Sequence, residues 1–302
     1  MSLNGSQLRA VEHTGGHLLI VAGPGTGKTH TLAFRIARVS RQLEPGQRLL
    51  AITFTHKAAE ELRGRLAKLS SDIRPVGSSP QGTSGLREEK VFVGTFHSFC
   101  LAYLREHIHD TDFPKELNIA TARDLERLAG ELWPDEPKRQ IKKKLHAVMG
   151  RKTRGSGGEI SGEVAAYNAA LKANALLDYD DLLLEAGKLL SSRRPEVPPA
   201  GSLSACGEEP TGRARKTEFA HVFVDEYQDI NALQRVLLRE FARLGVTVTA
   251  IGDPHQAIYS FRGADVSFFE RFAEDFKGAT VLSLSDNYRS APNLLKASGQ
   301  IV

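Results

Sequence analysis

The chain has 302 residues, of which 41% are hydrophobic and 25% charged, which is typical of a folded protein with a large core. Its two cysteines exclude a disulfide framework, no apolar run reaches the roughly 18–20 residues that cross a bilayer, and the N-terminus lacks a secretion signal. The net charge of +4 permits nucleic-acid binding without establishing it. We therefore expect a cytoplasmic protein without membrane contact.

Six short apolar runs predict buried strands, and helical patterns lie between them. The runs are Leu18–Ala22, Leu49–Phe54, Val91–Gly94, His221–Val224, Val246–Ile251 and Thr280–Leu284. The clearest helical patterns are Thr29–Val39, Lys57–Leu69 and Leu233–Leu244. Continuous apolar runs are typical of parallel strands that are covered on both faces. The alternation therefore predicts an α/β fold with a doubly wound parallel sheet.

The segment from about residue 105 to 174 shows helical patterns and no convincing strand. It predicts a small all-helical domain inserted into a sheet domain made of residues 1–104 and 175–302. A basic cluster in it comprises Lys138, Arg139, Lys142, Lys143, Lys144, Arg151, Lys152 and Arg154. This cluster is either a solvated helix face or a contact to DNA phosphates. The composition of Ser70–Lys90 and Ser191–Thr217, rich in Ser, Gly and Pro, predicts two mobile loops.

A glycine-rich loop joins the first predicted strand to the first long helix. It runs through Ala22, Gly23, Pro24, Gly25, Thr26, Gly27, Lys28 and Thr29. Glycine allows a tight turn and a close approach to a ligand, and the N–H groups at a helix N-terminus attract an anion. In a P-loop the lysine reaches the β- and γ-phosphates and the next hydroxyl binds magnesium. We therefore expect Lys28 to bind ATP and Thr29 to ligate Mg²⁺.

An acidic box follows the fourth predicted strand. Asp225 and Glu226 come directly after Val224, which places both carboxylates at the carboxyl edge of the sheet, where ligands of open α/β sheets bind. We expect Asp225 to hold magnesium, mainly through its water shell, and Glu226 to activate the attacking water as a general base. The alternative is an acidic cap on a helix. The phosphate loop earlier in the chain favours the catalytic interpretation.

With these two motifs, the chain resembles the N-terminal part of the UvrD/PcrA/Rep-like superfamily 1 DNA helicases. That part is the first RecA-like motor domain, a P-loop NTPase fold, with a helical insertion. Segments similar to further family motifs follow in order along nearly the whole chain: Leu3–Gln7, Ala51–Ala59, Gly94–Phe99, Leu177–Leu182, Val224–Asp229, Gly252–Asp265 and Asn287–Ser290.

The resemblance implies roles for residues around the nucleotide. Gln7 would hydrogen-bond the adenine edge, and Tyr288 would stack on its face. Gln256 would sense the γ-phosphate, and Arg289 would stabilise charge on the transferred phosphoryl group. His30 stands where the family usually has arginine, and a neutral imidazole is a weaker partner for phosphate or ribose. The implied catalytic residues are Lys28, Glu226, Gln256 and Arg289.

The resemblance also implies a contact surface for single-stranded DNA. Its residues would be Phe54, His56, Thr95, His97, Tyr259, Phe261 and Arg262. The aromatic rings would stack on bases without reading their sequence. His56 replaces the usual asparagine, and Phe261 replaces the usual tryptophan with a smaller ring. Core packing of Phe54, Phe261 or His97 and a surface ion pair of Arg262 are the alternatives.

The family's motor has two RecA-like domains with ATP between them, and we expect this chain to carry only the first. It would then bind ATP·Mg weakly, hydrolyse it slowly and not unwind DNA alone. In a full-length protein it would be an ATP-dependent DNA helicase of 3′–5′ polarity that contacts single-stranded DNA, single-strand/duplex junctions and the second motor domain. A helicase-nuclease, a nucleotide-dependent regulatory module and an RNA-directed helicase are the alternatives. The sequence gives no oligomeric state.

Overall fold

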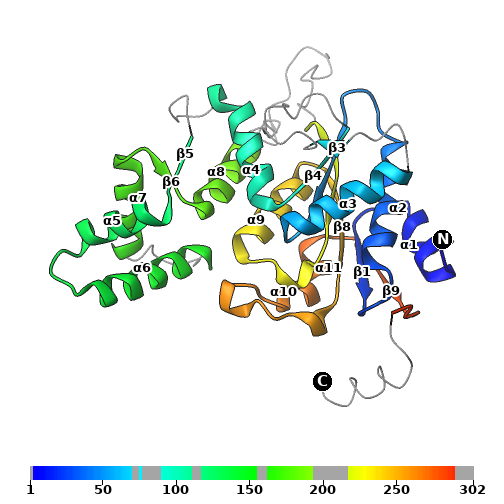
Figure 1. The fold of residues 1–302 in the computed structure, drawn as a ribbon. Helices are drawn as coiled ribbons and strands as arrows, with labels where there is room; N and C mark the ends of the chain where they lie inside the picture. The colour runs from blue at the N-terminus through cyan, green and yellow to red at the C-terminus, as the bar shows by residue number, and fades with distance from the viewer. Residues whose placement is uncertain are drawn as a thin grey trace, which may run out of the picture.

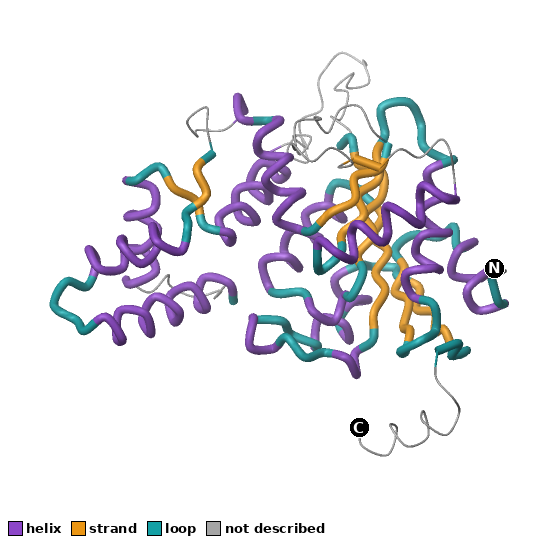
Figure 2. Tube along the Cα trace, viewed as in Figure 1, coloured by secondary structure: helices purple, strands orange, loops and turns teal. Residues whose placement is uncertain are grey.

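The computed structural model describes residues 3–69, 75–76, 90–110, 117–154, 162–192 and 217–289. Within these ranges seven parallel strands form one sheet in the order β3–β4–β2–β7–β8–β1–β9 (Figures 1 and 2). Their bounds are β1 (Leu18–Ala22), β2 (Arg48–Ile52), β3 (Pro75–Val76), β4 (Val91–Gly94), β7 (Phe219–Val224), β8 (Thr247–Gly252) and β9 (Thr280–Leu284). The predicted α/β parallel sheet is confirmed, and all six predicted strands belong to it.

Helices cover both faces of this sheet, because successive side chains of a strand point to opposite sides. Leu18 and Ile20 of β1 pack into the core beneath one layer of helices, and Leu19 between them packs into the core beneath the other. The first layer is α1 (Gly5–Glu12), α2 (Lys28–Ser40) and α3 (His56–Leu69). The second is α4 (Phe96–Glu106), α8 (Tyr179–Ser192), α9 (Ala232–Arg243), α10 (Ser267–Glu270) and α11 (Phe272–Asp275). The fold is therefore doubly wound, as predicted.

The register of the strands brings the chemically important turns to one edge of the sheet. Val21 of β1 lies opposite Gly252 of β8, and Ile52 of β2 lies opposite Val224 of β7. The strands are parallel, so the residues that follow them meet at the same carboxyl edge. This edge carries the glycine-rich loop, the acidic box and the start of the segment after β8.

A separate group of helices lies to one side of the sheet, at the left of Figure 1. It contains α5 (Ala122–Leu132), α6 (Lys138–Thr153) and α7 (Gly162–Ala173), which enclose a hydrophobic cluster of their own around Leu128, Val148 and Tyr167. The independent cluster is what a helical insertion requires. The division of the chain into domains stays a prediction.

Three short strands among the described residues were not foreseen. β5 (Asn118–Ile119) pairs in parallel with β6 (Leu176–Leu177), so the prediction of no strand between residues 105 and 174 was wrong. β3 lies within Ser70–Lys90, which was predicted to be a loop. Strands of two residues are too short to show a periodicity of two. Residues 70–74 and 77–89 of the first predicted loop, and 193–216 of the second, lie outside the described residues.

The basic cluster of the helical group is not a uniform solvated face, because some of its members are paired or buried, while Lys138, Arg139 and Lys143 are exposed. Its contact to DNA phosphates stays a prediction. Ion pairs join Lys142 to Glu126, Lys144 to Glu136 and Arg151 to Glu163. Lys152 is only 6% exposed. Across the described parts of the chain, no helix has the length and apolar character needed to cross a membrane.

Candidate functional site

The glycine-rich loop has the geometry that its composition predicts. Gly25 and Gly27 have φ values of +75° and +82°, which glycine adopts without strain. A Cβ atom on Gly25 would lie 2.6 Å from the Cβ of Arg289, and one on Gly27 would lie 2.7 Å from Nε2 of Gln7. Neither position has room for a side chain. The loop thus turns tightly between β1 and α2, with Lys28 and Thr29 in the first turn of the helix.

Gln7 ties the N-terminal helix to this loop. Its Nε2 donates to the carbonyl of Thr26 at 2.9 Å, and its Oε1 accepts from the backbone N–H of Asn4 at 3.1 Å, which completes a capping box at the start of α1. Gln7 is 3% exposed. Its amide therefore binds the backbone of the glycine-rich loop. The predicted contact of Gln7 to adenine stays a prediction.

The last described residues lie against the same loop. The backbone N–H of Tyr288 donates to the carbonyl of Gly25 at 2.9 Å, and the side-chain amide of Asn287 donates to the carbonyl of Pro24. Asn4 donates to the hydroxyl of Tyr288 at 2.6 Å. The Tyr288 ring is nevertheless 65% exposed, so a face is open for stacking. The structure thus brings Tyr288 and Arg289 to the loop. Their roles toward a nucleotide stay predictions.

The two carboxylates of the acidic box lie beside Lys28. Asp225 follows β7 and is 5% exposed; burial raises its pKa to about 7, and the neighbouring charge of Glu226 adds to this rise. Glu226 has φ +51°, which is rare for a residue with a side chain. Its Oε2 lies 2.9 Å from Nζ of Lys28. The predicted ATP-binding lysine and the predicted general base are therefore in direct contact.

Two further residues of this site were missed by sequence reasoning. Gln228 donates from Nε2 to Oε2 of Glu226 at 2.9 Å, and its Oε1 accepts from the N–H of Asp253 at 3.0 Å. Asp253 in turn accepts from Nε2 of Gln256 at 2.6 Å. A signal was present, since Gln228 lies two residues after Glu226 and Asp253 directly follows β8. Their partners could not be read from that spacing.

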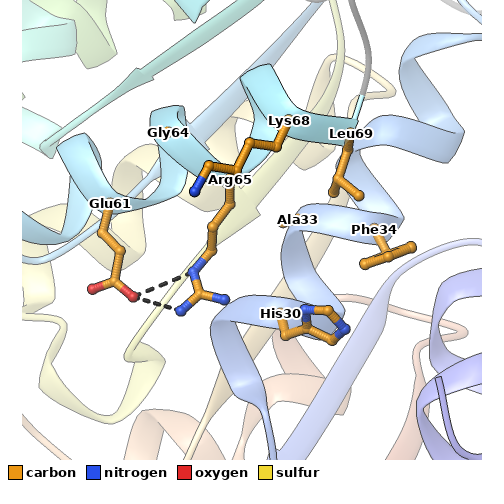
Figure 3. Close-up of a pocket in the computed structure, with 8 residues that line it drawn as sticks. All are labelled: His30, Ala33, Phe34, Glu61, Gly64, Arg65, Lys68 and Leu69. Carbon is orange, nitrogen blue, oxygen red and sulfur yellow. Dashed lines mark hydrogen bonds and ion pairs between the residues drawn. The ribbon is translucent and has the colours of Figure 1, made fainter. Parts of the chain in front are cut away.

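His30 lies in a pocket of about 590 Å³ between α2 and α3 (Figure 3). Its ring packs against Phe34 at a centroid distance of 4.7 Å, and Arg65, paired with Glu61, lines the same pocket. Burial lowers the pKa of His30, and its Nε2 has no hydrogen-bond partner in the described part of the chain. His30 thus lines this pocket with its ring against Phe34. Its contact to a nucleotide stays a prediction.

Three predicted DNA-stacking residues lie together. Phe54, after β2, packs against Tyr259 at a centroid distance of 4.8 Å, and Tyr259 packs against Phe261 at 5.9 Å. Phe261 is 77% exposed, so the proposal that it is a core residue does not hold. This row of rings, Phe54–Tyr259–Phe261, is named the aromatic strip below. His56 is exposed at the start of α3, and the side chain of Arg262 is outside the described part.

A second pocket of about 420 Å³ adjoins the aromatic strip and includes Phe54, Thr95 and His97. The Thr95 hydroxyl accepts from the N–H of Ser98 at 3.2 Å and so caps α4, a structural task that the prediction did not include. His97 packs edge-on against Tyr179 at 5.3 Å, and burial lowers its pKa. Tyr179 lines the pocket and is 58% exposed. It was missed, although it is the aromatic residue of the Leu177–Leu182 segment.

A family model described as the UvrD/REP helicase N-terminal domain matches residues 3–277. The chain belongs to this family. It is a helicase motor domain, as the resemblance implies, and its sheet has the predicted RecA-like P-loop fold.

Curated relatives support the family. The ATP-dependent DNA helicase PcrA of Bacillus subtilis is 31% identical over 99% of this chain and 39% of its own length. DNA helicase II of Escherichia coli is 31% identical over 100% of this chain and 40% of its own length. The ATP-dependent DNA helicase UvrD1 of Mycobacterium tuberculosis is 33% identical over 99% of this chain and 39% of its own length. The chain spans about two fifths of the length of these relatives.

Next to the second pocket, which Thr153 and Asp180 line, this UvrD/REP domain has a buried ionic junction between α6 and α8. Nζ of Lys152 lies 2.9 Å from Asp178 and 2.6 Å from Asp181. The hydroxyl of Tyr167 donates to Asp178 at 3.0 Å, and that of Thr153 donates to Asp180 at 2.7 Å. Lys152 was predicted as part of a basic surface, and that interpretation was wrong. It connects the helical group to the first turn of α8, next to Tyr179.

Asp180 of this junction predicts a pH dependence of stability. Burial raises its pKa to about 6 from 3.8, and the charge of Asp178 adds to the rise. Since folding favours the protonated carboxyl, its contribution to stability is present below about pH 4 and is lost as the pH rises through 6. We expect Asp180→Asn to gain stability relative to the wild type between pH 4.5 and 6.5 in denaturant titrations. Asp135→Asn, at an exposed position, is the control; a difference that does not change with pH would contradict this assignment.

Proposed function

We propose that this domain binds ATP with magnesium, hydrolyses the γ-phosphate and grips single-stranded DNA at the same edge of its sheet. The observation that carries the proposal is the meeting of Lys28, Asp225 and Glu226 at the carboxyl ends of β1 and β7. A P-loop lysine beside two carboxylates is the arrangement that phosphoryl transfer to water requires. A module that only binds nucleotide has no use for a general base.

The residues of the loop fit a nucleotide and its metal ion. The positive-φ glycines leave the loop open to phosphates, Lys28 would hold the β- and γ-phosphates, and Tyr288 offers an exposed ring to the adenine. Asp225 and Thr29 would hold magnesium, which would neutralise charge on the phosphates. The described residues contain no group of three or more His, Cys, Asp or Glu able to hold a metal, so phosphate and water oxygens would supply its other ligands.

Three further residues would act on the water and on the γ-phosphate. When Lys28 binds the phosphates, the ion pair between Lys28 and Glu226 would break. Glu226 could then accept the proton of the attacking water. Gln256, whose side-chain amide donates to Asp253, would sense the γ-phosphate. Arg289, beside Gly25, would stabilise charge on the transferred group.

The aromatic strip and the second pocket form the proposed DNA surface. Phe54 lies two residues after β2, and Tyr259 and Phe261 lie at the short 3₁₀ turn Ser260–Arg262 in the segment that follows β8. Tyr179 and His97 extend the surface to α8 and α4. Base stacking on such rings tolerates any sequence, as a translocating motor requires. Polarity of 3′–5′, contact to junctions and a second motor domain are proposed from family membership alone.

Substituting Phe261 tests the DNA part of this proposal. We expect oligo-dT to stimulate ATP hydrolysis by the purified protein, and Phe261→Ala to raise the half-stimulating concentration about 5- to 150-fold, since stacking contributes roughly 1–3 kcal/mol per base. Steady-state hydrolysis over a range of oligo-dT concentrations measures this. Val236→Ala, at another exposed apolar residue, is the control. An unchanged half-stimulating concentration in Phe261→Ala would contradict the proposed surface, and stimulation by RNA alone would favour an RNA helicase.

A further inference from the structure

Gln228 lies between Glu226 and Asp253 of the proposed site and is buried. It belongs to a short 3₁₀ turn, Tyr227–Asp229, directly after Glu226, and is 2% exposed. A glutamine in the interior must satisfy both ends of its amide, because an unpaired buried amide is costly. The partners of its two ends therefore decide what this residue does.

The two partners fix the orientation of the Gln228 amide. When the Glu226 carboxylate is ionised it can accept a hydrogen bond but cannot donate one, so it must face the Nε2 group of Gln228. The backbone N–H of Asp253 can only donate, so it must face Oε1 of Gln228. Turning the amide by 180° would place donor against donor and acceptor against acceptor. The site thus holds Gln228 in one orientation.

Gly252, the last residue of β8, packs directly against the side-chain amide of Gln228. A Cβ atom on Gly252 would overlap Oε1 of Gln228 and would lie 3.0 Å from the ring of Phe269 and 3.1 Å from the N–H of Tyr227. Only glycine at position 252 leaves room for the bond between Gln228 and Asp253. Two segments distant in sequence, the acidic box and the end of β8, meet at this point.

The bonds continue to Gln256. Asp253 accepts from the side-chain amide of Gln256 at 2.6 Å and from the N–H of His255 at 3.1 Å. A continuous path therefore leads from Gln256 through Asp253 and Gln228 to the carboxylate of Glu226. The path joins the proposed γ-phosphate sensor to the proposed general base.

Gln228 matters most when Lys28 leaves. Lys28 and Gln228 both donate to Oε2 of Glu226, each at 2.9 Å. Phosphates that attract Lys28 would remove the first donor, and Gln228 would then be the side-chain donor that remains on this oxygen among the described residues. Without it, no other side-chain hydrogen bond among the described residues would fix the orientation of the Glu226 carboxylate.

We infer that Gln228 is a positioning residue, which holds Glu226 in its working orientation and links that orientation to the segment carrying Gln256. The inference rests on the proposed function of Glu226. It assigns a role in hydrolysis to a residue that does not touch the nucleotide. Misplacing a reacting group by about 1 Å can slow a reaction about 100-fold, so the effect should fall on the chemical step.

Two substitutions separate this role from folding. Gln228→Met keeps the length of the side chain and removes both hydrogen bonds. Gln228→Glu keeps an acceptor for the N–H of Asp253, replaces the donor to Glu226 with a carboxylate oxygen and adds a negative charge beside Glu226. It therefore removes the proposed hold on Glu226 even if Gln228→Met does not fold. Gln47→Met, which removes a glutamine hydrogen bond in a surface turn, is the matched control.

The experiment measures ATP affinity and the single-turnover rate of hydrolysis, with protein in excess over radiolabelled ATP. We expect both Gln228 variants to lower the rate about 10- to 100-fold and to change ATP affinity less than about 3-fold. In a Glu226→Gln background, Gln228→Met should add almost nothing, because the residue through which it acts is already neutral.

Wild-type rates in both Gln228 variants, or an equal loss from Gln228→Met in both backgrounds, would overturn the inference while the proposed function stands. Normal hydrolysis in Glu226→Gln alone would instead overturn the proposed function. The two failures are therefore distinguishable in the same set of proteins.

Discussion

Replacing Glu226 with glutamine is expected to lower the rate of ATP hydrolysis about 10²- to 10⁴-fold, the usual contribution of a general base. The amide has nearly the same shape as the carboxylate but cannot accept the proton of the attacking water. ATP should bind as well as before or more tightly, because Lys28 would no longer be held by a charged partner 2.9 Å away. Single-turnover hydrolysis measures the predicted loss of rate, and equilibrium ATP binding on the same protein measures the predicted affinity.

The control for this substitution is Glu131→Gln, which makes the same chemical change at an exposed residue of α5. It should leave hydrolysis and ATP affinity unchanged. If Glu226→Gln lost ATP binding together with hydrolysis, Glu226 would be a structural partner of Lys28. If neither changed, the domain would be a nucleotide-dependent regulatory module.

Replacing Lys152 with methionine is expected to lower the free energy of unfolding by about 3–5 kcal/mol, the usual result of removing one partner from a buried ion pair. The side chain of Lys152 is 3% exposed, and its ammonium is held between Asp178 and Asp181. Methionine fills a similar volume but leaves two carboxylates without their cation. Urea unfolding with linear extrapolation measures the difference.

Lys142→Met is the matched control, since Lys142 lies on the same helix and has one ion pair with Glu126 in which its side chain is 62% exposed. An exposed pair contributes about 0–1 kcal/mol, so this variant should unfold almost as the wild type does. Equal stability of the two variants would contradict the buried junction. Weaker DNA binding by Lys152→Met without any loss of stability would restore Lys152 to a phosphate-binding surface.

The nucleotide half of the site could be predicted because its residues are fixed by local rules. Gly25, Gly27 and Lys28 lie between a strand and a helix, and Asp225 directly follows another strand. In a parallel sheet this is enough to bring them to one edge. The sequence needed only the strand ends, and those shifted by no more than two residues.

Other features depend on partners that are distant in the chain. Lys152 looks like any basic residue of α6 until Asp178 and Asp181 are placed against it. The role of Gln228 depends on Gly252 and Asp253, whose position is set by the pairing of β7 with β8. Neither composition nor periodicity contains such pairings. The two-residue strand β3 likewise forms because β4 offers it an edge.

The aromatic strip lies between these cases. The resemblance to the helicase family singled out Phe54, Tyr259 and Phe261, and the structure places them in contact. Tyr179 was not singled out, although it faces the same pocket from α8. Thr95 was expected to contact DNA, and that contact stays a prediction; its hydroxyl also caps α4, because a threonine before a helix has a backbone N–H within reach.

The most direct test of the central claim is a thermal-shift titration with ATP and magnesium of the wild-type chain and of Lys28→Ala. Ligand binding to the folded state raises Tm with ligand concentration. We expect Tm of the wild type to rise progressively and Tm of Lys28→Ala to stay constant, with both proteins folded before ATP is added. An equal rise in the two proteins would show that ATP binds elsewhere, and it would contradict the assignment of this loop as the nucleotide site.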